Sequence, residues 1–153
     1  MRRPKKNQKF TAIIAIDGGE VSGYAAWLSG RLDPKPHGYG TPQQLGRVGW
    51  LAPAAALWVI EAYTHGNCRA AQANGLNTAD AMYALGFKRN AAYVVTVGHT
   101  TWAKGLGCPR GRDEGKKWSI KRARKLGYDV TDHNEADAIN LLEYAKKKWL
   151  KDG

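Results

Sequence analysis

Two short apolar runs in this chain end in a carboxylate. Residues 10–17 read FTAIIAID and residues 56–63 read ALWVIEAY, so Asp17 and Glu61 stand at the ends of segments rich in β-branched and aliphatic residues. Runs of this length and composition predict strands that are buried on both faces of a sheet. If the two strands are adjacent and parallel, both acids emerge at the same edge, where ionised carboxylates repel each other unless a cation or a proton compensates.

Signals along the rest of the chain predict one mixed α/β domain over residues 10–153, after a mobile basic arm over residues 1–9. Three more strands are expected at residues 24–28, 37–40 and 91–97. A short helix is expected to start after Thr41, an N-cap that precedes Pro42. Longer helices are expected at residues 69–85, 116–126 and 134–149. Residues 98–115 are expected to form a glycine-rich basic loop. This order predicts a five-stranded mixed sheet flanked by helices.

A third carboxylate is expected to face the core from the last helix. At helical spacing, Asp137 shares a face with Asn134 and with three apolar residues, Ala138, Leu141 and Ala145. A helix laid against the sheet can therefore bring Asp137 to the edge that carries the other two acids.

Each acid also has a simpler explanation. Asp17 can stabilise a turn with Gly18 and Gly19, Glu61 can be an ordinary strand-terminal acid, and Asp137 can cap its helix. All three acids nevertheless occur together in a basic chain. This coincidence favours a site for Mg²⁺ or Mn²⁺, which prefer oxygen ligands.

The charge of the chain points to a polyanionic partner. Lysine and arginine number 24 against 13 acidic residues, a formal net charge of +11, which favours nucleic acid first and an anionic membrane surface second. No apolar run approaches the roughly 20 residues of a membrane span. Two cysteines are too few for a disulfide framework or a zinc site, so an intracellular protein is expected. The residues expected to contact nucleic acid are Lys104, Arg110, Arg112, Lys116, Lys117 and Lys121.

Three segments together resemble a known family. AIDGGEVSGYAAW (residues 15–27), WVIEAY (58–63) and NEADAINLLEYA (134–145) are similar, in order and spacing, to segments of the RuvC-type Holliday junction resolvases. The likeness is greatest to the small phage-encoded members of this family within the ribonuclease H-like superfamily. The family pattern is an aspartate before a glycine-containing turn, a glutamate that ends the fourth strand, and an Asp-Ala pair early in the last helix.

The resemblance implies that Asp17, Glu61 and Asp137 bind two catalytic Mg²⁺ ions, with Mn²⁺ able to substitute. Family members carry an acid or a histidine three residues before the last aspartate, whereas this chain has Asn134 there. Asn134 can offer a carbonyl oxygen. His133 and Asp132 are the alternatives for the fourth ligand, and all three choices stay open.

The implied activity is that of a crossover junction endodeoxyribonuclease, a magnesium-dependent hydrolase that cuts four-way or other branched DNA in recombination. A homodimer suits a two-fold symmetric junction, with the helix at residues 69–85 as a candidate interface. The expected location is the cytoplasm, that of the host if the gene is phage-borne, with no membrane and no nucleotide cofactor involved. The resemblance adds Tyr63 and Trp102 as expected DNA contacts and assigns the same role to Lys104. The alternatives are a non-catalytic branched-DNA-binding protein and a ribonuclease H-type nuclease that acts on hybrids.

Overall fold

The computed structural model describes residues 2–31, 36–62 and 68–150. A single five-stranded sheet has the strand order β3-β2-β1-β4-β5. The strands are β1 (Ala12–Asp17), β2 (Ser22–Leu28), β3 (His37–Gly40), β4 (Leu57–Ala62) and β5 (Tyr93–Gly98). β1, β2 and β3 pair antiparallel, whereas β1, β4 and β5 pair in parallel. The expected mixed sheet is confirmed, with β1 at its centre.

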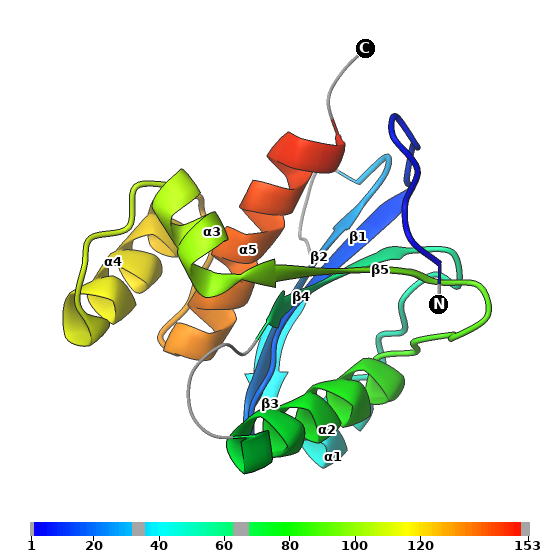
Figure 1. The fold of residues 1–153 in the computed structure, drawn as a ribbon, viewed down its shortest axis with the longest axis horizontal. Helices are drawn as coiled ribbons and strands as arrows, with labels where there is room; N and C mark the ends of the chain where they lie inside the picture. Colours follow the sequence, from blue (N-terminus) through cyan, green and yellow to red (C-terminus); the bar gives the residue numbers. More distant parts are fainter. Residues whose placement is uncertain (1, 32–35, 63–67, 151–153) are drawn as a thin grey trace.

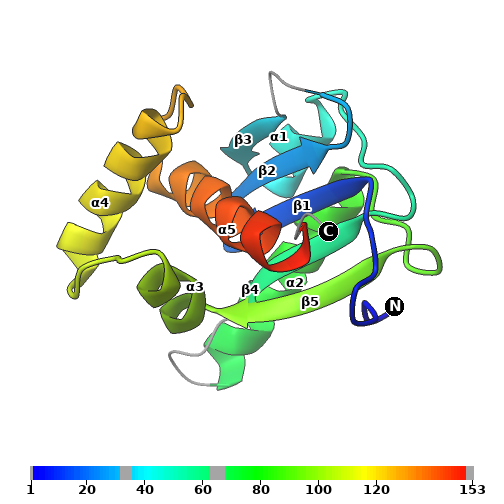
Figure 2. The ribbon, with the colours of Figure 1, turned by 90° about the horizontal axis from the view of Figure 1, so that it is seen from above.

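Helices cover both faces of the sheet (Figures 1 and 2). They are α1 (Pro42–Gly46), α2 (Cys68–Ala84), α3 (His99–Gly105), α4 (Arg112–Lys125) and α5 (His133–Trp149). α5 lies across β1 and β2 with α3 and α4 beside it, and α1 and α2 lie on the opposite face. In the described part of the chain, no helix is long and apolar enough to cross a membrane.

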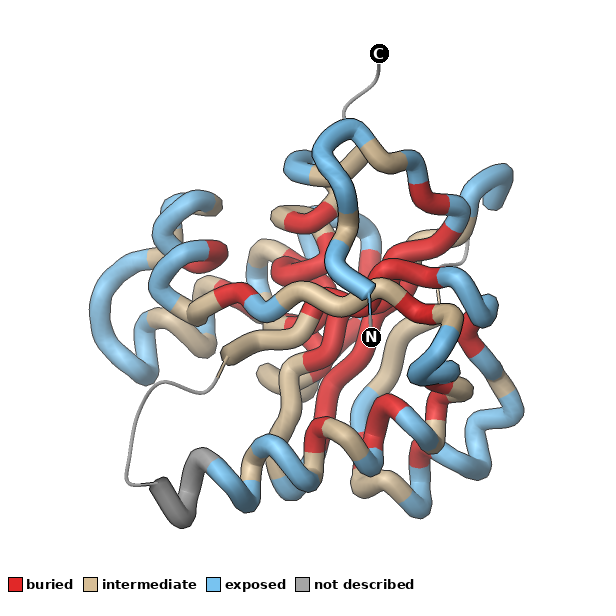
Figure 3. The backbone as a smooth tube through the Cα atoms, turned by 45° about the vertical axis from the view of Figure 1, so that its right-hand side comes forward, coloured by how far each residue is buried: buried red, intermediate tan, exposed pale blue. Residues whose placement is uncertain are grey.

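The alternation of side chains in β1 explains why its sequence is apolar throughout. Ile13 and Ala15 pack in the core beneath α5, whereas Ile14 and Ile16 pack in the core beneath α1 and α2. Because successive residues of a strand point to opposite faces, a strand covered on both sides needs apolar residues at every position. Figure 3 shows that the buried backbone is concentrated at the centre of the molecule.

The start of α1 follows its sequence signals. Thr41 Oγ1 accepts a hydrogen bond from the Gln44 amide nitrogen at 3.3 Å, and Gln44 Oε1 accepts one from the Thr41 amide nitrogen at 2.9 Å. This reciprocal pair is a capping box, and Pro42 occupies the first turn. The expected N-cap is confirmed.

The expected loop over residues 98–115 is wrong. Residues 99–105 form α3, and α4 begins at Arg112, so only residues 106–111 connect two helices. Trp102 and Ala103 of α3 are buried in the core beneath α5. Burial of this indole stabilises a short helix that glycines on either side make hard to recognise locally.

The basic arm at residues 1–9, which the sequence predicts to be mobile, contacts the sheet through Arg2. Arg2 forms an isolated parallel bridge with Tyr93, with a hydrogen bond from the Val94 amide nitrogen to the Arg2 carbonyl oxygen at 2.9 Å. The Arg2 guanidinium lies 5.9 Å from the centre of the Tyr93 ring. β5 is an edge strand with unpaired backbone groups, which explains why the arm pairs with it.

Candidate active site

The carboxyl ends of three adjacent parallel strands carry Asp17, Glu61 and His99. β1 and β4 pair in register up to the residues that precede Asp17 and Glu61. β5 pairs in parallel with β4, and His99 directly follows its last residue. Ala15 and Val59 pack beneath α5. By strand alternation, Asp17 and Glu61 point toward the same layer. The expectation that both acids emerge at one edge of the sheet is confirmed.

The start of α5 brings the third carboxylate to this edge. A Cβ on Gly23 of β2 would collide with the carbonyl group of Asn134, so α5 begins in direct contact with the sheet. Asp137 lies about one turn further along, and its Oδ1 accepts a hydrogen bond from Ser119 Oγ of α4 at 2.5 Å. The N-cap of α5 is Asp132, whose Oδ1 accepts from the Asn134 amide nitrogen at 2.9 Å. Helix capping therefore does not explain Asp137.

The glycines after Asp17 permit close packing by α2. A Cβ on Gly18 would collide with the Thr78 side chain. The turn itself is closed by Ser22, whose hydroxyl contacts the backbone nitrogen and oxygen of Gly19 at 3.4 and 3.3 Å. The turn therefore has its own side-chain hydrogen bonds, and Asp17 is not needed to stabilise it.

The three carboxylates act on one another electrostatically. Burial raises the pKa of Asp17 well above its usual value, and the charges of Glu61 and Asp137 raise it further. Burial raises the pKa of Asp137 to about 6, against the hydrogen bond from Ser119, and Glu61 adds to the rise. Negative charge at this edge is therefore poorly compensated by the protein. A divalent cation would neutralise it.

His99 is a site residue that the sequence did not reveal. Its Nδ1 lies 2.7 Å from Glu61 Oε1, and its ring packs edge-on against Trp102, with ring centres 5.0 Å apart. The hydrogen bond with Glu61 raises the pKa of His99, although burial opposes the rise. Val97 of β5 faces the core beneath α5. Because side chains alternate along a strand, residue 99 is expected to point to the same face as Val97, which is the face of Asp17 and Glu61. This alternation is the one sequence signal that could have identified His99.

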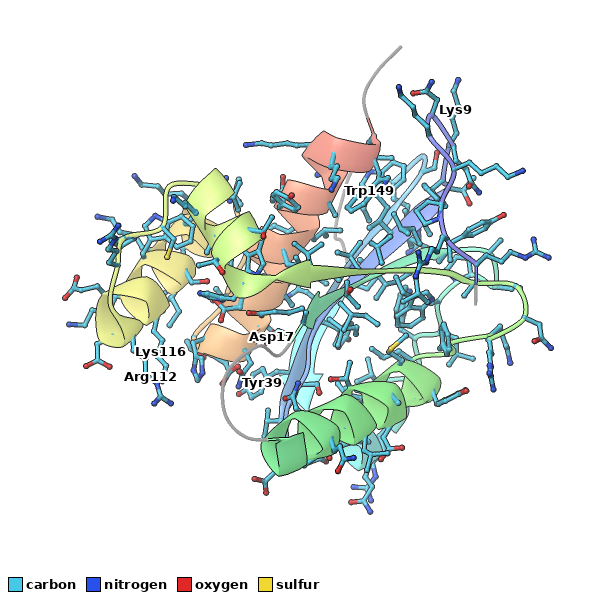
Figure 4. The ribbon with its side chains drawn as sticks, in the orientation of Figure 1. Lys9, Asp17, Tyr39, Arg112, Lys116 and Trp149 are labelled. Atoms are coloured by element: carbon cyan, nitrogen blue, oxygen red, sulfur yellow. The ribbon has the colours of Figure 1, made fainter. Side chains whose placement is uncertain are left out.

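The acids and His99 line a pocket of about 950 Å³. Its other walls come from α3, the segment between α3 and α4, the first turns of α4, and the start of α5. Figure 4 shows Asp17 at the end of β1, and Arg112 and Lys116 extending from α4. The basic residues that line this pocket are Lys104, Arg110, Arg112 and Lys116. The pocket therefore combines a carboxylate cluster with cationic walls.

The remaining expected DNA contacts lie elsewhere. Lys117 and Lys121 are exposed and line a separate shallow groove along α4. Trp102 is fully buried, so the expectation that it contacts DNA is wrong, because no face of the indole is open to a base. Tyr63 lies outside the described residues.

The start of α5 offers two of the three candidates for a fourth ligand. Asn134 and His133 both line the pocket, whereas the carboxylate of Asp132 is engaged in capping α5. An amide oxygen and an imidazole nitrogen are both possible metal ligands.

The donor set can be compared with what a magnesium site requires. Three carboxylates and an amide give oxygen donors only, which fits Mg²⁺ and Mn²⁺. Among residues 2–31, 36–62 and 72–150, however, no three His, Cys, Asp or Glu side chains are grouped as a ready-made metal site. The chemistry of the donors fits, and the side chains would have to draw closer together to share an ion.

Comparison with known proteins identifies the fold. No protein-family model and no curated protein matches the sequence. Among solved structures, Thermus thermophilus RuvC is similar over 90% of this chain and 97% of its own, with 16% identity and a TM-score of 0.52. T. thermophilus RuvC in complex with a Holliday junction substrate is similar over 92% of this chain and 96% of its own, with 16% identity and a TM-score of 0.55. The chain has a RuvC-type, ribonuclease H-like fold.

Proposed function

We propose that this protein is a metal-dependent endonuclease that resolves four-way or other branched DNA junctions. The observation that carries the proposal is the convergence of Asp17, Glu61 and Asp137 on one pocket with cationic walls. A RuvC-type fold supports it, and one of the similar solved structures holds a Holliday junction substrate. A phosphodiester bound in such a pocket would face both the basic side chains and the acid cluster.

Asp17, Glu61, Asp137 and Asn134 would hold the metal ions, two Mg²⁺ per site with Mn²⁺ as a substitute. When bound, such a pair activates a water molecule and stabilises the departing oxygen of the phosphodiester. Asp17 would be the central ligand of this set, because β1 is the central strand and the charges of both other acids act on Asp17. Because the pKa of Asp137 is raised to about 6 and that of Asp17 is also raised, protons would compete with a metal ion for these carboxylates, and binding should strengthen as pH rises.

The protein's own residues hold the acids and the DNA in place. His99 holds Glu61 through Nδ1, which limits the rotation of that carboxylate. Lys104, Arg112 and Lys116 would contact phosphates on either side of the cleaved bond. Lys117 and Lys121, on a separate groove of α4, would contact phosphates further from the cut.

Two symmetric cuts in a four-way junction require two active sites, so we propose a homodimer. α2 remains the candidate interface. Its residues Leu76 and Tyr83 are 68% and 56% exposed and lie seven positions apart, on one face of the helix, where a second copy of the chain could cover them.

The test is a cleavage panel with the wild-type protein and Asp17→Asn. Synthetic four-way junctions, flaps, forks and RNA–DNA hybrids are incubated with Mg²⁺, with Mn²⁺ or with EDTA. We expect paired symmetric nicks in the four-way junction that need a divalent ion. Asp17→Asn should abolish these nicks while junction binding persists. Asp129→Asn, which removes an exposed carboxylate from the segment between α4 and α5, is the matched control and should cleave normally.

Other outcomes identify the alternatives. Binding without cleavage by the wild-type protein would indicate a non-catalytic junction-binding protein. Preferred cleavage of the hybrid would indicate a ribonuclease H. Cleavage that survives Asp17→Asn would contradict the proposed site.

A further inference from the structure

A buried hydrogen-bond chain joins α4 to Asp137. Arg122 Nη1 donates to Asn140 Oδ1 at 2.8 Å, and Asn140 Nδ2 donates to the carbonyl oxygen and the hydroxyl of Ser119 at 3.0 and 2.9 Å. Ser119 Oγ then donates to Asp137 Oδ1 at 2.5 Å. Ser119 and Asn140 are 1% and 0% exposed, so water does not compete for these bonds.

The chemistry of each group fixes the direction of the chain. A guanidinium can only donate and a carbonyl oxygen can only accept, so the Asn140 amide has one possible orientation between Arg122 and Ser119. Asn140 Nδ2 therefore donates to the Ser119 hydroxyl, whose single proton remains for Asp137. Within the described residues, Ser119 is the only hydrogen-bond donor to the Asp137 carboxylate. The rotation of that carboxylate is thus set from α4.

α4 also carries Arg112 and Lys116, which line the same pocket. Ser119 is two turns beyond Arg112 and one turn beyond Lys116 on this helix. A single rigid element therefore presents cations to the pocket and orients one of its acids. Groups that fix the orientation of a metal-binding carboxylate typically change metal affinity or activity by about 10–100-fold when they are removed.

We propose that Ser119 is a positioning residue for the reaction: its hydroxyl holds Asp137 in the orientation that binds metal, and Asn140 holds the hydroxyl. This inference rests on the proposed function, because it assigns Asp137 to the metal site. Ser119 is buried and does not line the pocket. It acts through Asp137 alone.

Ser119→Ala isolates this role. The substitution removes the donor to Asp137 but leaves the Ser119 backbone carbonyl, which still accepts from Asn140 Nδ2. The packing of α4 on α5 therefore keeps a hydrogen bond. Thr41→Ala is the matched control, because it also deletes one hydroxyl, but from the capping box of α1 on the opposite face of the sheet.

The experiment measures the affinity of the full chain for Mn²⁺ alone by titration calorimetry, together with thermal unfolding, junction binding in EDTA and single-turnover cleavage. Ser119→Ala is expected to weaken Mn²⁺ binding about 10-fold or more and to slow cleavage of the bound junction by a similar factor. Junction affinity in EDTA should stay within about two-fold of wild type, as for groups that do not touch DNA. Thr41→Ala should lower the unfolding temperature and leave Mn²⁺ affinity unchanged.

Wild-type Mn²⁺ affinity in a folded Ser119→Ala variant would overturn the inference, even if the wild-type protein cleaves junctions as proposed. Absence of both Mn²⁺ binding and cleavage in the wild-type protein would overturn the proposed function and this inference with it. If Ser119→Ala does not fold, Ser119→Cys provides the comparison. Its thiol is a weaker donor, so reduced Mn²⁺ affinity supports the inference and wild-type affinity contradicts it.

Discussion

His99 Nδ1 lies 2.7 Å from Glu61 Oε1, so the first residue of α3 is tied to the end of β4. The two side chains follow adjacent parallel strands and meet at the edge of the sheet that also carries Asp17. His99 is the nearest group that can offset the charge of Glu61 among the described residues. The pair therefore links the acid cluster to the segment that supplies the cationic wall of the pocket.

This pair predicts a pH-dependent loss of stability in His99→Gln. The hydrogen bond with Glu61 raises the pKa of His99 above its ordinary 6.5, so folding favours the protonated imidazole. Its stabilising effect is complete below the unfolded pKa and disappears as pH rises through the higher folded-state pKa. Urea unfolding in EDTA at about pH 5.5 and about pH 9 should show the larger destabilisation at the lower pH. Equal destabilisation at both values contradicts this account.

Asp137→Asn should stabilise the metal-free protein at neutral pH. The pKa of Asp137 rises from 3.8 to about 6 on folding, so the folded state binds more protons and stability falls as pH rises across this interval. Asparagine carries no charge and keeps an oxygen that can accept from Ser119. We expect a gain of about 1–3 kcal/mol at pH 7.5 in EDTA, measured by urea unfolding. Asp129→Asn, at an exposed position between α4 and α5, should change stability little. A loss of stability in Asp137→Asn would argue against a crowded acid cluster.

Gly23→Ala should displace the start of α5. The added Cβ would collide with the carbonyl group of Asn134, so the helix must shift away from β2 and carry Asp137 with it. We expect a loss of about 1–3 kcal/mol in stability together with slower junction cleavage. Gly46→Ala is the matched control, because a Cβ there meets open space at the last residue of α1 and improves helix propensity. The measurements are thermal unfolding and junction cleavage of both variants. Equal unfolding temperatures and equal cleavage rates in the two would contradict the predicted displacement of α5.

The two sides of α4 should affect different steps. Arg112→Ala with Lys116→Ala removes two cations from the pocket, whereas Lys117→Ala with Lys121→Ala removes two from the separate groove. Each double variant should weaken junction binding and lower its salt dependence by about one unit per lost phosphate contact. Only the pocket pair should also slow single-turnover cleavage of fully bound junction. Equal cleavage rates in the two double variants would show that the pocket cations do not contribute to the cleavage step.

The sequence predicted the elements whose patterns are local. Apolar runs gave the strands that end at Asp17 and Glu61, and helical spacing placed Asp137 on the buried side of α5. Elements that depend on contacts between distant parts of the chain could not be predicted from such local patterns. α3 depends on burial of Trp102 beneath α5, and the pairing of Arg2 depends on an open edge of β5.

In the site, too, residues marked by a local pattern were predictable and residues that depend on long-range contacts were not. The three acids were recognisable because carboxylates at the ends of apolar runs are costly unless they have a partner. His99 and Ser119 were not recognisable, because each gains its role from a neighbour 38 or 18 residues away in the chain. Only the packing of β5 beside β4, and of α4 on α5, brings them to Glu61 and Asp137.

The most direct test of the central claim is the position of bound Mn²⁺ in crystals of the wild-type protein, located by anomalous scattering. The account predicts manganese peaks in contact with carboxylate oxygens of Asp17, Glu61 and Asp137, which have moved together around the ions. No peak between these three side chains, or manganese bound only elsewhere, would contradict it.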